Sequence, residues 1–493
     1  MLFIEQARMF KEFLVNVSPP NRDVSIIKPK VGFVVTPWLF TAVPWYSITL
    51  ALLSERMGAE PVIIFDDLGF GKDDEEQIGI IEENLSLVSN YMRIIKLSEN
   101  TSDTFISIEE SEEISRLSYL NAVWKSRTDD FGSVGDKISE DLKKRLIENS
   151  ALIKSFFKKN SFDRMIVPGG IYGNSGLYLF FGKKYGIRVS TYDSGPGSML
   201  AGYEDVAAYQ TDTKIIAGNL NDLFSEEDIS RMKGYAQQEL NLRLTGRSAI
   251  NYQLKTINSN PTKDNFDILI PLNVVWDAAA LGKHRLFKNT YSWVTETLQF
   301  LIENTTATVV IRQHPAENMF REKYNLVESL KKKYIESNRV VIYSCEEFVN
   351  TYELIKNSSI VLPHTSTVGI EASILKREVI IESDCYYSEA SFVYKANSKD
   401  EYFKTIVQAL QKDADNKLDD DVLLYYFLSQ VCGVLRTNFT PQPGDFSLWV
   451  EKDINELLLD RNIQKLTKSF ISDQQLTLLN AYDKLKEGIN LGQ

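Results

Sequence analysis

Short apolar runs that favour β-strands alternate with longer helical segments along most of this chain, and the series occurs twice. This alternation predicts parallel sheets joined by right-handed crossovers, because two parallel strands need a long connection between them. A polar stretch at residues 258–265 separates the two series and is typical of an interdomain linker. The sequence therefore predicts an α/β fold made of two Rossmann-like domains with a cleft between them.

The predicted elements give the domain boundaries. Residues 1–257 are expected to form an N-terminal domain with a charged helical insertion around 99–159, and residues 266–440 a second domain. Residues 441–493 are expected to be a helical tail that packs back across the domains. Strands are predicted at 31–35, 61–65, 92–95, 164–167, 187–191 and 206–209, then at 267–271, 308–311, 340–343, 360–362 and 379–381. Helices are predicted between them, for example at 291–303 and 317–333.

Charge, cysteine usage and hydropathy exclude several classes of protein. The 55 basic and 67 acidic residues give a net charge of −12, which argues against a nucleic-acid-binding surface. The cysteines Cys345, Cys385 and Cys432 are widely spaced, so we expect free thiols in a cytoplasmic chain rather than disulfides or a metal site. No stretch approaches about 18 uninterrupted apolar residues, so no membrane span is predicted. We expect a soluble protein that lies at most peripherally against a membrane.

Two polar blocks follow strands of the second domain. Residues 312–315 read Arg-Gln-His-Pro, and residues 364–372 read His-Thr-Ser-Thr-Val-Gly-Ile-Glu-Ala. Open α/β sheets bind ligands at the carboxyl ends of their strands, and the amides and hydroxyls of a helix start attract phosphate oxygens. We interpret the two blocks as a donor site for a phosphate-bearing ligand, such as a nucleotide sugar.

In the first block, Pro315 favours an extended conformation at His314, which would fix the direction of the imidazole. A protonated His314 could bind a phosphate or give its proton to a departing phosphate oxygen, and Arg312 would add positive charge. The alternative is a turn histidine that only caps the next helix. The parallel placement of the second block favours the ligand interpretation.

In the second block, Ser366 and Thr367 stand at the expected helix start, where they would hold the phosphate. Gly369 would allow the phosphate to approach closely, and Glu371, one turn deeper, could accept hydrogen bonds from a ribose diol. The alternative is an ordinary capped helix packed on the sheet. His364 precedes the helix start and is predicted to be structural.

Two further groups follow strand ends. Asn273 and Asp277 come after the first strand of the second domain and could line the donor pocket. Asp66 and Asp67 could bind a metal, but adjacent acidic residues more often form a solvated turn, and no metal site is predicted. Neither a Walker sequence nor a dinucleotide glycine triad is present.

The acceptor side is predicted in the first domain, where residues 191–198 read Thr-Tyr-Asp-Ser-Gly-Pro-Gly-Ser. Asp193 at a strand end would suit a general base that deprotonates an acceptor hydroxyl. Tyr192 and Gly195 beside it, and Gly170 in the turn of residues 168–175, would lie on the same acceptor side. The alternative for Asp193 is an Asx-turn residue in a Gly/Pro loop.

The order Tyr-Asp-Ser-Gly, Arg-x-His-Pro and Ser-Thr-x-Gly-x-Glu-Ala resembles the GT-B glycosyltransferases of bacterial capsule and lipopolysaccharide synthesis. It is most similar to the capsule-biosynthesis type and its relatives, the Kdo transferases and bacterial sialyltransferases. The resemblance covers mainly residues 267–410, and a weaker similarity is present around Asp193. It implies an inverting, metal-independent transfer without a cofactor, commonly from a CMP-activated acidic sugar such as Kdo or sialic acid, to a glycan or glycolipid acceptor.

The resemblance also implies roles for single residues. Asp193 falls on the acidic motif as the base, His314 on the His-Pro motif, and Ser366 and Thr367 on the hydroxyl motif. The chain departs at Ser194, where the relatives have a second acid that could itself be the base.

The sequence leaves other functions open. The hydroxyl block is also similar to that of enzymes using UDP or GDP donors. A non-hydrolysing nucleotide-sugar epimerase shares the fold, but its usual Asp-Ser-Gly-Gly is replaced here by Thr-Ser-Thr-Val-Gly. A non-catalytic nucleotide-binding module is the third alternative. For the transferase, we expect a location at the inner face of the cytoplasmic membrane, within a polysaccharide-assembly complex.

Overall fold

The computed structural model describes residues 2–18, 28–71, 74–130, 132–195, 197–247, 265–319, 326–412, 419–437 and 453–487. Residues 258–264 of the predicted linker and 441–452 of the predicted tail lie outside these ranges. The chain divides into two compact units. The first contains Met1–Asn121, Lys137–Asp212 and Cys432–Glu487, and the second contains Ala122–Asp136 and Thr213–Val431.

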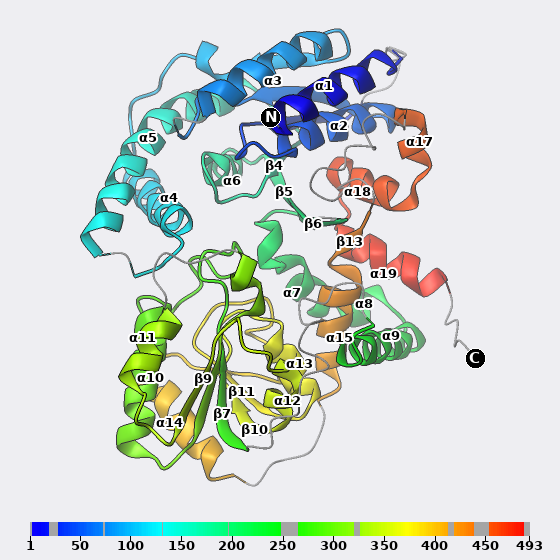
Figure 1. Ribbon diagram of the computed structural model, residues 1–493. Helices are drawn as coiled ribbons and strands as arrows, with labels where there is room; N and C mark the ends of the chain where they lie inside the picture. The colour runs from blue at the N-terminus through cyan, green and yellow to red at the C-terminus, as the bar shows by residue number, and fades with distance from the viewer. Residues whose placement is uncertain are drawn as a thin grey trace. The chain divides into compact units, whose positions relative to one another are not determined.

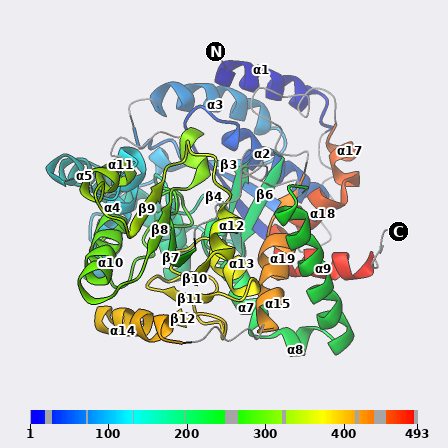
Figure 2. The same cartoon turned by 60° about the horizontal axis from the view of Figure 1, so that its bottom comes forward.

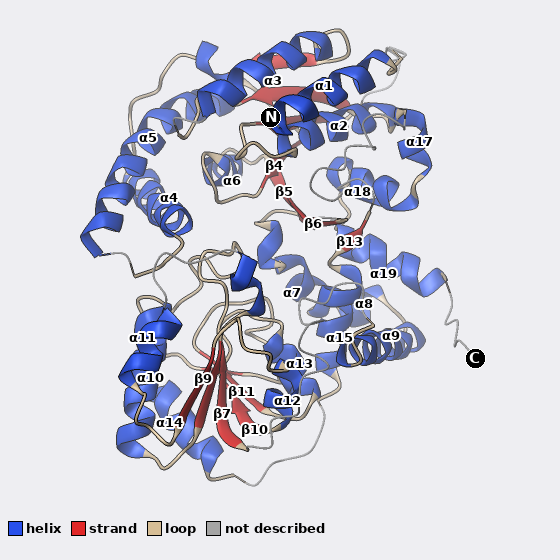
Figure 3. Ribbon diagram, viewed as in Figure 1, coloured by secondary structure: helices blue, strands red, loops and turns tan. Residues whose placement is uncertain are grey.

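The first unit is built on a seven-stranded sheet in the order β13-β6-β5-β4-β1-β2-β3. Figure 3 labels β4, β5, β6 and β13 of this sheet. The strands from β3 to β5 run parallel, whereas β5 and β6 form an antiparallel pair, as do β6 and β13. The bounds are β1 (Lys30–Val35), β2 (Glu60–Phe65), β3 (Arg93–Lys96), β4 (Arg164–Pro168), β5 (Arg188–Gly195), β6 (Ser198–Gly202) and β13 (Leu435–Arg436).

Both faces of this sheet are covered, because successive side chains along a strand point in opposite directions. Along β1, Phe33 and Val35 belong to one hydrophobic core and Val34 to another. The core around Phe33 is shared with α1 (Leu2–Val15), α2 (Val43–Arg56), α3 (Asp74–Val88), α17 (Ile454–Leu459), α18 (Arg461–Ile471) and α19 (Leu476–Lys486). The core around Val34 is shared with α4 (Ile108–Ser126), α5 (Gly132–Lys159) and α6 (Ser175–Lys184). The short 3₁₀ segments are η1 (Leu97–Glu99) and η2 (Ala207–Tyr209).

The second unit contains a six-stranded, all-parallel sheet in the order β12-β11-β10-β7-β8-β9, and Figure 2 shows its strands in this sequence. The bounds are β7 (Phe266–Pro271), β8 (Val309–Arg312), β9 (Val340–Tyr343), β10 (Ser358–Val361), β11 (Glu378–Ile381) and β12 (Tyr394–Lys395). The chain leaves β7 to build β8 and β9 on one side and then returns to place β10 on the other. The strand order therefore reverses between β7 and β10, the point at which doubly wound sheets bind their ligands.

Helices flank this sheet on two sides (Figure 1). One core joins β7 and β8 to α10 (Thr290–Asn304), α11 (Leu326–Lys333) and α14 (Lys399–Leu410). On the other side lie α12 (Thr351–Lys356) and α13 (Val368–Ile374) (Figures 1 and 2). The unit also contains α8 (Leu220–Leu223), α9 (Glu226–Leu244), α15 (Asp421–Tyr426), η3 (Pro315–Met319) and most of α7 (Thr211–Ala217), and the π-helix η4 (Phe427–Cys432) ends it.

The α/β class with two Rossmann-type units is confirmed. Some details differ. Residues 207–209, predicted as part of a strand, form a 3₁₀ turn. Of the helix predicted at 317–333, residues 317–319 belong to η3 and 326–333 form α11, while 320–325 lie outside the described residues. The boundary between units falls at Asp212, earlier than residue 257. The reason is that α9 packs on α15, and Lys233 of α9 pairs with Asp420. Among the described residues, no helix is long and apolar enough to cross a membrane.

Candidate functional site

The candidate donor site is built at the carboxyl edge of the second sheet. Three loops meet there, after β8, after β7 and after β10, because these strands are neighbours in the sheet. His314 lies in the first loop, Asn273 in the second and Ser366 in the third. The sheet therefore brings together polar residues that are far apart in the sequence, at its switch point.

A pair of hydrogen bonds joins the loops after β7 and β10. The Asn273 side-chain amide donates to Thr365 Oγ1 at 3.1 Å, and the backbone N–H of Thr365 donates to Asn273 Oδ1 at 3.2 Å. Asn273 thus fixes the residue that precedes Ser366. Asp277, predicted in the same pocket, is exposed and accepts a hydrogen bond from the N–H of Ala279 within its own turn, at 2.9 Å.

His314 is a neutral side chain in this structure. Burial, and then the neighbouring charge of Arg312, lower the pKa of the imidazole to about 4. Its Nδ1 accepts a hydrogen bond from the N–H of Ala316 at 3.1 Å, so the ring proton is on Nε2. The expectation of a protonated His314 is therefore corrected: at neutral pH the ring offers one hydrogen-bond donor, Nε2–H.

Arg312 is only 2% exposed at the end of β8. Its Nη1 donates to the carbonyl of Ser344, while Nε and Nη2 have no hydrogen-bond partner among the described residues. A buried guanidinium with unused donors is suited to an anion, since burying an unpaired charge is costly.

Gln313, which the motif analysis did not single out, fixes this loop. Its side-chain Oε1 accepts a hydrogen bond from the N–H of Cys345 at 2.9 Å, and its Nε2 donates to Glu317. The loop after β8 is thereby joined to the loop after β9.

The hydroxyl block begins α13 as predicted, with Ser366 and Thr367 partly exposed just before the first helical residue, Val368. The Ser366 hydroxyl accepts a hydrogen bond from the N–H of Val368 at 3.3 Å. Gly369 has a different role from the predicted one. A Cβ at this position would lie 2.5 Å from the hydroxyl oxygen of Tyr387, which donates to the carbonyl of Ser366 at 2.6 Å. The missing side chain makes room for Tyr387.

Glu371 is 3% exposed and already paired. Its Oε1 accepts hydrogen bonds from Arg243 Nη1 and from the hydroxyl of Tyr352, both at 3.1 Å. The predicted ribose acceptor is thus part of a buried ion pair between α9 and α13. No local pattern around Arg243 in the sequence marks it as the partner of a residue more than a hundred positions away.

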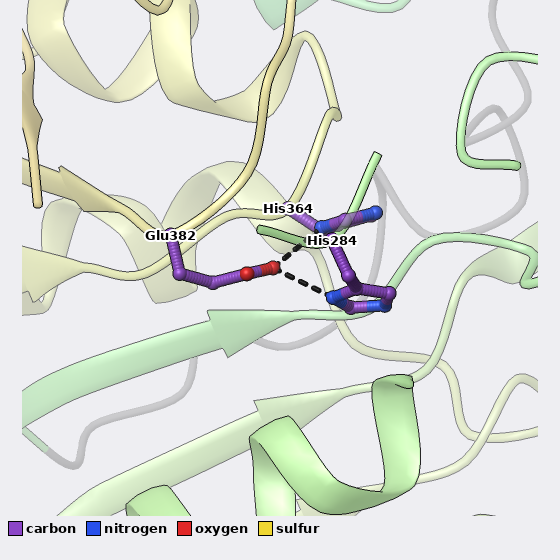
Figure 4. Close-up of side chains that lie close together, drawn as sticks. All are labelled: His284, His364 and Glu382. Atoms are coloured by element: carbon purple, nitrogen blue, oxygen red, sulfur yellow. Dashed lines mark hydrogen bonds and ion pairs between the residues drawn. The ribbon is translucent and has the colours of Figure 1, made fainter. Parts of the chain in front are cut away.

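His364 lies in a buried cluster with His284 and Glu382 (Figure 4). Glu382 Oε1 lies 2.7 Å from His284 Nδ1 and 2.9 Å from His364 Nδ1. The two rings stack with centroids 3.9 Å apart. His364 is thus anchored inside the unit, which agrees with a structural role. Glu382 directly follows β11, so the rule of polar residues at strand ends could have identified it.

On the first unit, Asp193 lies within β5, which continues beyond its parallel pairing as a hairpin with β6. Tyr192 is the last residue of β5 paired in parallel, with Pro168, and Asp193 pairs with Leu200 of β6. Asp193 therefore stands just beyond the carboxyl edge of the parallel sheet, partly exposed. Gly195 ends the strand, and the following Pro196 is outside the described residues.

The other predicted acceptor-side residues are core positions. Tyr192 is 1% exposed, and its hydroxyl lies 2.7 Å from Ser47 Oγ of α2. Gly170 is buried with φ of 97°, and a Cβ there would lie 2.9 Å from both Leu179 and Thr191. Both residues were predicted to lie on the acceptor side, but in the structure they pack inside the fold.

Asp66, at the end of β2, is 1% exposed rather than in the solvated turn that was predicted. Asn174 Nδ2 donates to both of its carboxylate oxygens at 3.1 Å. Burial raises the pKa of this carboxyl to about 6. Asp67 accepts a hydrogen bond from the N–H of Ser98 at 2.9 Å.

Comparison with known proteins gives one family match, which contains most of the second unit. Residues 206–434, slightly less than half of the 493-residue chain, match the sequence profile of the family described as "Capsule polysaccharide biosynthesis protein". This match confirms the predicted resemblance to proteins of capsule biosynthesis. No match was found among curated proteins.

Solved structures give distant likenesses. The KpsC beta Kdo 2,7 transferase of Thermosulfurimonas dismutans is 19% identical, with a TM-score of 0.35, over 56% of this chain and 78% of that one. The UDP-GlcNAc 2-epimerase of Methanocaldococcus jannaschii is 15% identical, with a TM-score of 0.30, over 82% of this chain and 99% of that one. MurG of Acinetobacter baumannii is 8% identical, with a TM-score of 0.26, over 86% of this chain and 98% of that one.

Proposed function

We propose that the protein is an inverting glycosyltransferase of bacterial surface polysaccharide synthesis. It would transfer a sugar from a nucleotide-sugar donor, preferably a CMP-linked acidic sugar, to a glycan or glycolipid acceptor. The observation that carries the proposal is the meeting of the His-Pro and Ser-Thr loops at the switch point of the second sheet, where Asn273 joins the loops after β7 and β10. The match of residues 206–434 to the capsule polysaccharide family supports it.

In this mechanism the donor phosphate lies against the loops after β8 and β10. His314 Nε2–H donates a hydrogen bond to a phosphate oxygen, as do the hydroxyls of Ser366 and Thr367, and the unused nitrogens of Arg312 add positive potential. These donors stabilise the negative charge that grows on the leaving phosphate. A neutral imidazole does this without a change of protonation state.

The acceptor hydroxyl is activated by Asp193, whose carboxylate takes its proton. The acceptor oxygen then forms a bond to the anomeric carbon while the bond from that carbon to the phosphate oxygen breaks, and the nucleotide leaves. One displacement of this kind inverts the configuration at the anomeric carbon. No step needs a divalent metal, so we expect turnover to be unchanged by added Mg²⁺ or Mn²⁺.

The acceptor would be met at the inner face of the cytoplasmic membrane, within a polysaccharide-assembly complex. This part of the proposal rests on the family match alone. Co-sedimentation with vesicles that carry a glycolipid acceptor tests it.

Nucleotide binding tests the donor site directly. A thermal-shift screen with CMP, UDP, GDP and dTDP should show stabilisation by one nucleotide class, with CMP favoured. His314→Ala should weaken the affinity for that nucleotide by roughly 10- to 100-fold, the value of a hydrogen bond to a charged group. Glu303→Gln, near the carboxyl end of α10, is the matched control and should bind as the wild type does, because this end of α10 leads into the amino end of β8. Absence of any shift with all four nucleotides would refute the site.

A further inference from the structure

We propose that His284, His364 and Glu382 bind one divalent transition-metal ion of the zinc type, as a structural site of the second unit. The proposal does not depend on the proposed transfer reaction. It concerns an ion that holds the fold and takes no part in the chemistry.

The three side chains converge from three segments of the chain (Figure 4). His284 follows β7 and forms a β-bridge with Ser383, His364 follows β10, and Glu382 follows β11. Both Nδ1 atoms point at the same carboxylate oxygen, Oε1, from 2.7 and 2.9 Å. Three potential ligand atoms therefore share one small volume.

The outer nitrogens of both rings have partners of their own. His364 Nε2 lies 3.3 Å from the carbonyl oxygen of Ala280, which can only accept, so this nitrogen carries a proton. His284 Nε2 lies 3.1 Å from the hydroxyl of Thr290. The Thr290 hydroxyl can donate or accept, so it is compatible with the His284 proton on Nε2; in that tautomer the Nδ1 lone pairs and the Glu382 carboxylate all face one another. Such a group of acceptors needs a positive charge among them.

The surroundings match what a bound ion requires. A metal-ligating histidine almost always donates its other N–H to a carboxylate, a backbone carbonyl or water, and ligating carboxylates are themselves hydrogen-bonded. The carbonyl of Ala280 meets the first condition for His364, and the hydroxyl of Thr290 takes the same position beside His284. The backbone N–H groups of Arg285 and Leu286, at 3.3 and 3.5 Å from Glu382 Oε2, supply the second.

The donor set selects the ion. Two imidazole nitrogens and one carboxylate oxygen suit zinc and similar first-row divalent ions, whereas Mg²⁺ and Ca²⁺ prefer oxygen ligands. Zinc lies about 2.0–2.2 Å from such ligands, so tetrahedral ligand atoms are somewhat farther apart than 2.7 Å. Glu382 must therefore move back by about half an ångström as the ion enters. A bound ion would hold the loops after β7, β10 and β11 together.

Metal analysis of the purified full-length chain tests the proposal. We expect one zinc-type ion per chain by mass spectrometry of the elements, lost in Glu382→Gln and in His364→Asn. The chain has three histidines, so His314→Ala is a matched control that removes the one outside the cluster. It should keep the ion, and so should Cys345→Ser, which removes a partly exposed thiol. Loss of the ion in either control, with retention in Glu382→Gln, would overturn the proposal.

A second measurement uses the wild-type protein and so does not depend on whether a variant folds. After removal of metals with a chelator, titration with Co²⁺ should produce a visible absorption band that saturates at one ion per chain, and Zn²⁺ should abolish it. Thr290→Val should weaken Co²⁺ binding by about 10-fold or more, because it removes the hydroxyl beside His284 Nε2. Absence of both the band and any thermal stabilisation by Zn²⁺ would show that the cluster shares protons only, and would overturn the proposal.

Discussion

His314 is a neutral hydrogen-bond donor in this structure, because burial and the charge of Arg312 lower the pKa of its imidazole to about 4. A donor in this form stabilises a leaving phosphate but is a poor source of a proton at neutral pH. Proton movement in the proposed reaction is thereby assigned to one residue on the acceptor side. That residue is Asp193.

Replacing Asp193 with Asn should lower turnover by about 10²- to 10⁴-fold, the usual contribution of a positioned general base. Nucleotide affinity should stay as in the wild type, because Asp193 belongs to the other unit. Turnover and nucleotide titration, measured on the same preparation, check both statements. Ser194→Ala at the next position of β5 is the control. Full activity of Asp193→Asn would remove this residue from the mechanism.

Between elements, the pair Arg243–Glu371 joins α9 to α13. Both side chains are largely buried, with exposed fractions of 14% and 4%, and the N–O distance is 3.1 Å. A buried ion pair is weak evidence for net stabilisation, but removal of one partner leaves a buried charge uncompensated. We therefore expect the pair to be needed for the packing of α9 against the rest of the second unit.

Arg243→Ala should therefore lower the free energy of unfolding by about 3–5 kcal/mol. Lys233→Ala on the same helix is the matched control, because Lys233 pairs with an Asp420 side chain that is 70% exposed. Exposed pairs contribute about 0–1 kcal/mol. Urea unfolding measures the loss in the free energy of unfolding for both variants. Equal, small losses would contradict the assignment of Arg243 to a buried ion pair.

At the start of α13, Gly369 makes room for Tyr387. Gly369→Ala should destabilise the protein by about 1–3 kcal/mol, since the new Cβ would lie 2.5 Å from the tyrosine oxygen. In a Tyr387→Leu background the same substitution should cost clearly less, because the tyrosine oxygen and the ring carbons at 2.9 and 3.0 Å from the new Cβ are gone. A double-mutant cycle by thermal unfolding measures this coupling. Equal costs in both backgrounds would show that Tyr387 is not the reason for the glycine.

For the whole molecule, buried carboxyls set how stability varies with pH. Burial raises the pKa of Asp66 to about 6 and that of Asp212 to about 7, from about 3.8. In both cases the folded state binds the proton more tightly than the unfolded state does. The contribution of each carboxyl to the free energy of unfolding is therefore fully present at low pH. For Asp66 it is lost as the pH rises from about 4 through 6, and for Asp212 as the pH rises from about 4 through 7.

Asp66→Asn should therefore become more stable relative to the wild type as the pH rises from 4 to 7. The increase should reach at most about 3 kcal/mol, the equivalent of a two-unit pKa difference. Denaturant unfolding at pH 4, 5, 6 and 7 measures the difference in the free energy of unfolding between Asp66→Asn and the wild type. The difference at pH 4 serves as the internal reference. A difference that does not change with pH would mean that the Asp66 carboxyl has an ordinary pKa in the fold.

Much of the fold could be predicted from local sequence. Strand–helix alternation is a local pattern, so the parallel strands and the α/β class followed from it. Positions such as His314 and Ser366 were found because a polar block directly after a buried strand must lie at the sheet's carboxyl edge. The boundary of the units was not predicted, because it depends on where α9 packs and not on the linker composition.

The sequence by itself determined the two Rossmann-type units and the residues at the ends of their strands, since both depend on neighbours within a few positions. Only the tertiary structure decided what those residues do there. Glu371 is taken by Arg243, Gly369 accommodates Tyr387, and His364 meets His284 and Glu382. These partners are distant in the chain, and the physical reason they were not foreseen is that a long-range contact leaves no periodic or local signal in the sequence.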